Sequence, residues 1–261
     1  MKKQTNTYAF IDLGQEKDDS VLFTGNFVPL DPECEIFDIL RSAGIKEVRE
    51  MLSCRTYEDY QKLGKCRIAL GMRYSSDKNI RYFEEQLEMP YFSFPASYDA
   101  DIIRKGYEHI CEMLGAGIPD TKEMYEKAVD HAKETAELLN GLEIAIDSSG
   151  AMRPFAAALA LLKYGFNIRY IVRRNNKLMF DQEEVDIVER THPEIKILYR
   201  DSYKEAFPEE GKNDILAIGT DAKRILGTKY CANIWHDEGY FGFHGIVKLM
   251  NTIREAVGIN G

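Results

Sequence analysis

Short hydrophobic runs alternate along the chain with longer stretches in which hydrophobic residues recur at helical spacing. In the first part of the sequence, the short runs predict strands over residues 21–24, 47–52, 67–70 and 91–94. The stretches between them predict helices over residues 31–44 and 78–87. Strands that alternate with helices are typical of a parallel sheet with helices on both faces.

The helix predicted over residues 31–44 carries start and stop signals. Asp31 is a residue type that caps helices, and Pro32 suits the first helical position. Gly44 follows the last hydrophobic position and is typical of a helix end. The hydrophobic face between these signals consists of Ile36, Ile39, Leu40 and Ala43.

The same alternation resumes in the second half of the chain. Strands are predicted over residues 142–147, 167–172, 194–198, 214–219 and 229–235. Helices are predicted over residues 153–164, 182–190, 202–207 and 246–257. Two further helices, over residues 100–114 and 120–139, would join the halves, and the second begins with Asp120 and Glu123 as a reciprocal capping pair.

These elements predict an α/β protein with two Rossmann-like, doubly wound parallel-sheet domains joined by helices. We place the first domain at residues 1–116. The second domain, residues 117–261, includes the C-terminal helix. A chain of 261 residues is near the upper limit for one hydrophobic core, which is consistent with two domains.

Composition excludes several classes of protein. With 44% hydrophobic and 30% charged residues the chain has the composition of a folded globular protein, and its net charge of −9 argues against nucleic-acid binding. The longest apolar run, residues 155–162, is too short to span a bilayer, and the start leads into no signal-like apolar core. We therefore expect a cytoplasmic protein that binds neither nucleic acid nor membrane. The 5 cysteines show no CxxC spacing, which argues against a zinc ribbon or a ferredoxin-type loop.

In doubly wound sheets, ligands bind beyond the carboxyl ends of the strands, where loops and helix N-termini converge. If the strand ends of the two domains face each other, the loops would line a cleft. Because several of these loops contain Arg, Ser or Asn, the cleft could hold an anionic group. The candidate loops are residues 25–27, 53–55, 71–74, 95–98, 147–150, 173–175, 219–221 and 236–237.

Two of these loops also have purely structural interpretations. Residues 147–149 could cap the helix that follows them, and we favour this over ligand contact. Arg173 and Arg174 could form a solvated loop or an anion site, and both interpretations stay open. The sequence contains no GxGxxG, Walker lysine or nucleophile-elbow motif, so nothing specific supports dinucleotide or ATP binding.

Few side chains are candidates for binding a metal. Cys54 could be a soft ligand, although an inert thiol is the favoured interpretation. His236 and His244 flank the C-terminal motif and are the two histidines to test as ligands.

The C-terminal motif 239–245, GYFGFHG, leads into an amphipathic helix and resembles the C-terminal signature of the nitrogenase component 1 family. That family includes nitrogenase molybdenum–iron protein subunits, the scaffolds that mature their cofactor, and light-independent protochlorophyllide reductases. The first half is similar too, because 24–26, 43–45, 67–72, 82–85 and 89–91 follow the order and spacing of the family. The resemblance covers nearly the whole chain and corresponds to the later two of the family's three domains.

The resemblance also shows where this chain departs from the catalytic nitrogenase subunit. By spacing, the cysteine that anchors the iron–molybdenum cofactor falls on Met72, and the histidine anchor in the tail motif falls on Phe241. A thioether is a poor substitute for a thiolate, and a phenyl ring is no ligand. The family's N-terminal domain, with its relay-cluster cysteines, has no counterpart. The resemblance therefore implies a protein that does not reduce dinitrogen.

Relatives that reduce tetrapyrroles use the corresponding cavity for an apolar macrocycle, and aromatic and Met side chains would suit such a guest. The resemblance thus implies an oxidoreductase-family protein that holds an iron–sulfur metallocofactor or a tetrapyrrole-like ligand between its two lobes. The expected metal ligands are Cys54 and His236. The expected cofactor contacts are Met72, Arg73, Tyr74, Tyr98, Ser148, Ser149, Tyr240 and Phe241.

Three alternatives stay open. The chain could be a reductase subunit that forms a homo- or hetero-oligomer with a nitrogenase-like subunit, borrows that subunit's relay cluster and receives electrons from an ATP-driven iron protein. It could be a noncatalytic cytoplasmic module that binds a cofactor or metal. It could also be a structural subunit that docks a partner through helix 246–257, although we favour packing of that helix on its own protein.

Overall fold

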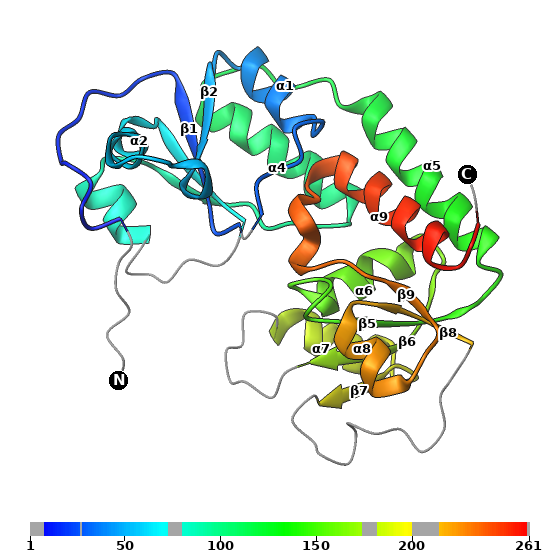
Figure 1. The fold of residues 1–261 in the computed structure, drawn as a ribbon. Helices are drawn as coiled ribbons and strands as arrows, with labels where there is room; N and C mark the ends of the chain where they lie inside the picture. The colour runs from blue at the N-terminus through cyan, green and yellow to red at the C-terminus, as the bar shows by residue number, and fades with distance from the viewer. Residues whose placement is uncertain (1–7, 27, 73–79, 174–181, 200–213, 260–261) are drawn as a thin grey trace. The chain divides into compact units, whose positions relative to one another are not determined.

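The computed structural model describes residues 8–26, 28–72, 80–173, 182–199 and 214–259 and contains two parallel sheets with helices (Figure 1). This confirms the predicted α/β class. The chain divides into two compact units: residues 1–96 with 105–119, and residues 97–104 with 120–261. Helix α4 (Ala100–Met113) is divided between the units: its first residues belong to the segment Ser97–Arg104 of the second unit, and the rest belongs to the first unit. The domains inferred from sequence, 1–116 and 117–261, stay a prediction.

The sheet of the first unit has the strand order β2-β1-β3-β4, and all its strand pairs are parallel. Its strands are β1 (Ser20–Thr24), β2 (Glu47–Glu50), β3 (Ile68–Gly71) and β4 (Tyr91–Ser93). The associated helices are α1 (Ile36–Ser42), α2 (Tyr57–Lys62) and the π-helix η3 (Tyr82–Gln86). The order reverses between β1 and β3, so this is the point where such a sheet opens a crevice at its carboxyl edge.

The sheet of the second unit has the order β7-β6-β5-β8-β9 and is also parallel throughout. Its strands are β5 (Glu143–Asp147), β6 (Asn167–Arg173), β7 (Lys196–Tyr199), β8 (Ile215–Ile218) and β9 (Tyr230–Ala232). Its helices are α5 (Lys122–Leu138), α6 (Pro154–Lys163), α7 (Gln182–Thr191), α8 (Thr220–Leu226) and α9 (Gly242–Ala256). This is a doubly wound order whose reversal lies between β5 and β8.

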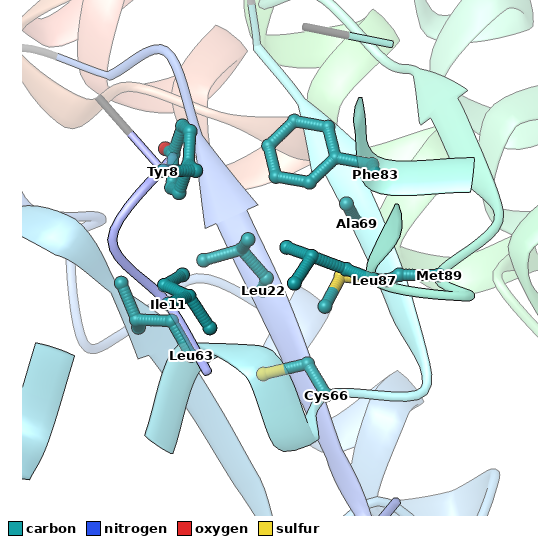
Figure 2. Packing of buried hydrophobic residues seen from close by; sticks show 9 residues of the cluster. All are labelled: Tyr8, Ile11, Leu22, Leu63, Cys66, Ala69, Phe83, Leu87 and Met89. Atoms are coloured by element: carbon teal, nitrogen blue, oxygen red, sulfur yellow. The ribbon is translucent and has the colours of Figure 1, made fainter. Parts of the chain in front are cut away.

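A hydrophobic cluster supports one face of the first sheet (Figure 2). Leu22 on β1 lies between the N-terminal segment, which contributes Tyr8 and Ile11, and the segment that contributes Phe83 and Leu87. All of these side chains are at most 5% exposed. Val21 and Phe23, which point to the other face of β1, are 0% exposed, so this strand is buried on both faces, as the hydrophobic run in the sequence predicted.

Helices α5 and α9 pack side by side in the second unit (Figure 1). Arg254 on α9 is 7% exposed, and its guanidinium donates to Thr135 Oγ1 and Glu134 Oε2 on α5, both at 2.8 Å. The apolar face of α9, including Ile246, Leu249 and Ile253, is buried. The C-terminal helix therefore packs on its own unit. Within the described residues, no helix has the length and apolar character needed to cross a membrane.

The helix predicted over 31–44 is wrong at its start. Helix α1 begins at Ile36, because Asp31 forms a turn instead: its backbone carbonyl accepts from Cys34 N and its carboxylate accepts from Glu33 N. Glu35 ends this turn with its carboxylate accepting from the buried Tyr107 hydroxyl at 2.7 Å. A tertiary contact thus overrides the local start signal.

Other element ends also differ from the prediction. Helix α5 begins at Lys122 rather than Asp120; the Asp120 carboxylate accepts from Lys122 N at 3.2 Å, whereas the N-cap, Thr121, makes no side-chain capping bond. Strand β9 ends at Ala232, because Ile234 N donates to Ala232 O and closes a turn. Helix α9 begins at Gly242, earlier than predicted. The helix predicted over 202–207 lies outside the described residues.

Candidate functional site

The carboxyl edge of the second sheet is organised around Asp147, the last residue of β5. Its side chain is completely buried. One carboxylate oxygen accepts from Ser149 N at 2.5 Å, Ser149 Oγ at 2.5 Å and Gly150 N at 3.0 Å. The other accepts from Ala222 N at 2.5 Å, in the first turn of α8. The carboxylate therefore replaces its lost hydration with fixed donors from two turns.

Ser149 completes this arrangement. Its hydroxyl accepts from Thr220 N at 3.1 Å and from Asp221 N at 3.4 Å. The N-cap residue of α8 is Gly219, which has no side chain, so Asp147 and Ser149 supply the acceptors for that helix end. The capping role favoured from sequence is thus present, but it is directed at α8 rather than at α6, the helix that follows in the chain.

Two glycines allow the turns after β5 and β8 to approach each other. A Cβ atom on Gly150 would lie 2.8 Å from Ile218 O and 2.9 Å from Gly219 Cα. Gly219 has a φ of +105°, and a Cβ there would lie 2.3 Å from the Asp147 carboxylate. Backbone and a buried anion therefore fill the space at this strand reversal, where a doubly wound sheet would offer a phosphate site.

The segment after β9 reaches the same turn. His236 N donates to Ser149 O and Asp237 N donates to Gly150 O, both at 2.8 Å. His236 and Asp237 have φ values of +48° and +62°, a conformation that side-chain-bearing residues rarely adopt. The turn after β5 therefore holds two consecutive residues in the left-handed region.

Asp237 is anchored through its side chain as well, and it is 3% exposed. Its carboxylate accepts from Tyr98 Oη at 2.7 Å and from Met152 N at 3.1 Å. Tyr98 is itself 3% exposed, and its carbonyl accepts from Tyr164 Oη at 3.0 Å. Tyr98, predicted as a cofactor contact, thus has its hydroxyl directed at Asp237 within the protein.

The side chains that remain partly accessible at this edge include aromatic and neutral groups, and two half-buried arginines, Arg153 and Arg173, also lie there. Trp235 is 52% exposed, and its indole meets the His236 imidazole edge-on at 4.5 Å between ring centroids. Ser148 and Tyr240 are half-buried, and the Tyr240 hydroxyl pairs with Thr252 Oγ1 at 3.1 Å. Phe241, another predicted contact, is 1% exposed.

In the first unit, the strand reversal lies between Thr24 and Gly71. Met72, the residue after β3, is 3% exposed and its N–H donates to Thr24 O at 2.9 Å. The Thr24 hydroxyl also hydrogen-bonds Tyr8 Oη. Met72 is therefore a packed residue at the carboxyl edge of this sheet. Its predicted neighbours in the site, Arg73 and Tyr74, lie outside the described residues.

A buried carboxylate also lies at this edge of the first sheet. Glu50, the last residue of β2, accepts from Asn26 Nδ2 at 2.7 Å and from Leu30 N at 3.1 Å. Burial raises the pKa of Glu50, although the bonds from Leu30 and Asn26 oppose that shift. The carboxylate fixes the loop after β1 through these two contacts, which no local sequence pattern predicts.

The thiols of this chain are poorly suited to hold an iron–sulfur cluster. Burial raises the pKa of all five, and that of Cys66 reaches about 11. Cys54, the predicted soft ligand, packs against the hydrophobic cluster of the first unit and lies 3.6 Å from Glu50 O. A cluster needs several thiolates at close spacing. The donor set fits a guest that requires a single protein ligand better than one held by several cysteines.

The structure brings part of the predicted site together. Ser149 and His236 meet through their backbones, and Tyr98 joins them through Asp237. Trp235 was not predicted as a site residue, because it fell inside the strand predicted over residues 229–235, whereas β9 ends at Ala232. Within the second unit, this edge presents a histidine and aromatic faces on a rigid turn, which can bind a planar aromatic or metal-centred group.

Comparisons with known proteins agree with this fold. A family profile described as "Nitrogenase component 1 type Oxidoreductase" matches residues 9–257. The structure "Nitrogenase Cp1 at pH 6.5" is similar with a TM-score of 0.68 and 16% identity over 95% of this chain and 62% of that one. "Nitrogenase Cp1 at pH 5" is similar with a TM-score of 0.52 and 16% identity over 98% of this chain and 62% of that one. No curated protein matches the sequence.

The chain thus spans less than two thirds of the length of these nitrogenase chains. At 16% identity the two structures support the fold, whereas the profile match covers nearly the whole sequence. The resemblance inferred from the C-terminal motif and from the order of the elements is therefore confirmed. The chain belongs to the nitrogenase component 1 type oxidoreductase family.

Proposed function

We propose that this protein binds a metal tetrapyrrole or a closely related metallocofactor at the carboxyl edge of the second sheet and does not reduce dinitrogen. The observation that carries the proposal is the rigid turn after β9, which presents Trp235 and His236 beside the Ser148–Gly150 turn. A neutral imidazole is a good ligand for iron or zinc. Its aromatic surroundings suit an apolar macrocycle.

The proposed roles differ among the predicted residues. His236 would supply the nitrogen ligand, and Ser148 and Tyr240, both half-buried, would contact the edge of the guest. Ser149 and Tyr98 would act by holding the turn, because their polar groups already have partners in the protein. Met72, Arg73 and Tyr74 of the first unit, and Phe241, stay predicted contacts.

The side chains at the two expected anchor positions do not suit dinitrogen reduction. The positions to which the resemblance assigns the two cofactor anchors hold Met72 and Phe241, and both side chains are at most 3% exposed. Neither side chain provides a thiolate or imidazole. We further propose that any reduction by this protein needs a partner subunit that carries an iron–sulfur relay and an ATP-driven iron protein as electron donor.

The test is a titration of the anaerobically purified full chain with zinc protoporphyrin IX and, separately, with metal-free protoporphyrin IX. We expect a saturable shift of the porphyrin absorption with both. His236→Ala should weaken binding of the zinc form by about tenfold or more, since even the loss of an outer-shell partner of a metal ligand costs that much, and should leave the metal-free form nearly unchanged. His192→Ala, which alters another histidine of the second unit, should change neither.

Absence of saturable binding by wild-type protein would overturn the proposal. An equal loss for both porphyrins in His236→Ala would contradict the ligand role of the imidazole. Cys54→Ala tests whether the Cys54 thiol is the metal ligand instead. We expect little change in zinc porphyrin binding, because burial raises the pKa of this thiol. A tenfold loss of binding in Cys54→Ala would favour the thiol instead.

A further inference from the structure

Trp235 is the only tryptophan of the chain, and it occupies an unusual position. Its side chain is 52% exposed, whereas Ile234 before it is 1% exposed and Asp237 after the next residue is 3% exposed. Large aromatic side chains contribute most to stability when they are buried. The indole is thus displayed to solvent from a backbone whose neighbouring residues are packed into the protein.

The backbone next to Trp235 is strained. His236 and Asp237 both have positive φ values, a backbone conformation that residues other than glycine adopt only at a cost in stability. Two backbone hydrogen bonds of 2.8 Å, from His236 N to Ser149 O and from Asp237 N to Gly150 O, hold the pair in place. Strain of this kind persists only where surrounding contacts over-determine the conformation.

The Asp237 side chain adds two more constraints from other parts of the unit. Tyr98 Oη donates to one carboxylate oxygen at 2.7 Å, and Met152 N donates to the other at 3.1 Å. The His236 imidazole meets the indole edge-on, at an interplanar angle of 79°. These contacts fix the backbone next to Trp235, whose exposed ring lies on the turn after β9 at the carboxyl edge of the sheet.

We propose that Trp235 is a stacking platform for the planar conjugated ring of the guest, an inference that rests on the proposed function and specifies its ligand class. An indole offers a wide π-face with no charge, so it favours flat aromatic systems over simple metal ions or anions. Because the turn is already rigid, stacking requires little loss of conformational freedom on binding. Tyr98 is then a positioning residue, which acts through Asp237.

The experiment compares wild type, Trp235→Ala and Trp235→Phe by titration with metal-free protoporphyrin IX, which needs no metal ligand. Trp235→Ala should weaken binding by about tenfold, as removal of an aromatic stacking partner does elsewhere. Trp235→Phe should retain most of the affinity because it keeps a π-face. Exposure of the side chain predicts that unfolding midpoints in urea stay close to that of wild type for both variants.

A second comparison tests the positioning role. Tyr98→Phe removes the hydroxyl that holds Asp237, so it should weaken porphyrin binding in the wild-type background and have no further effect in the Trp235→Ala background. Tyr164→Phe is the matched control, because it removes a buried hydroxyl that holds the same segment but does not touch Asp237. An additive effect of Tyr98→Phe would contradict the positioning role.

The outcomes separate this inference from the proposed function. Wild-type binding that Trp235→Ala leaves unchanged would overturn the stacking platform and leave the proposed function intact. If wild type binds no porphyrin at all, both fail. If Trp235→Phe loses as much affinity as Trp235→Ala, the indole is recognised by something other than its π-face, and the inference is wrong.

Discussion

Asp147→Ala should lower the free energy of unfolding of the second unit by about 4 kcal/mol, within the range expected when a buried charged partner of several hydrogen bonds is removed. The carboxylate is fully buried and accepts from Ser149 N, Ser149 Oγ, Gly150 N and Ala222 N. Alanine leaves these donors without their acceptor in a site that admits little water. Urea unfolding of the full chain, followed by far-UV circular dichroism, measures the loss.

Asp214→Ala is the matched control, since this exposed carboxylate precedes β8, the strand beside β5, and therefore lies at the amino edge of the same sheet. It should change the unfolding free energy by no more than about 0.5 kcal/mol. The two units can unfold in separate steps. Both variants are therefore compared with wild type at the unfolding transition of the second unit. A loss below about 1 kcal/mol for Asp147→Ala would show that the carboxylate does not organise this edge as described.

Gly219→Ala should be comparably harmful, with a loss of about 3 kcal/mol or more. Gly219 has a φ of +105°, and its Cβ would lie 2.3–2.6 Å from the Asp147 carboxylate. That carboxylate cannot swing away, because four hydrogen bonds from three residues hold it. The measurement is again the urea transition of the second unit.

Gly141→Ala distinguishes the cost of the backbone conformation from the cost of the clash with Asp147. Gly141 has a φ of +77° and open space around its Cβ direction, so alanine there should lower the unfolding free energy through backbone strain alone, by about 1 kcal/mol. Combining Gly219→Ala with Asp147→Ala should cost less than the sum of the single changes, since the missing carboxylate makes room for the new methyl group. Strictly additive losses would argue against the clash.

The regular elements of both sheets could be predicted because most of the strands are short apolar runs between turn residues; β2 (EVRE) is an exception. The run that predicted 142–147 appears as β5, Glu143–Asp147, and the run at 167–172 appears as β6, Asn167–Arg173. Helix α2 was missed although Thr56 gives a readable start signal, and its hydroxyl accepts from Asp59 N at 3.1 Å. This error came from an overlooked local motif rather than from tertiary structure.

The candidate site was only partly predictable, because its determinants are long-range. Asp147 was read as a cap for the next helix in sequence, but its partner Ala222 lies 75 residues later. The left-handed conformation of His236 and Asp237 depends on hydrogen bonds to Ser149 and Gly150. It could therefore not be predicted from the two residue types. Strand order can place the ends of β5 and β9 at one edge of the sheet. Local sequence patterns cannot predict which residues of the two turns form hydrogen bonds with each other.

Hydrogen–deuterium exchange of the full chain, with and without saturating zinc protoporphyrin IX, locates the segments that the guest covers. We predict that binding protects two segments of the second unit, residues 148–152 and 234–241, which form the turns after β5 and β9. Helix α7 should exchange at an unchanged rate and serves as an internal reference. Protection confined to other segments, or none despite saturable binding, would show that the guest does not bind at this edge.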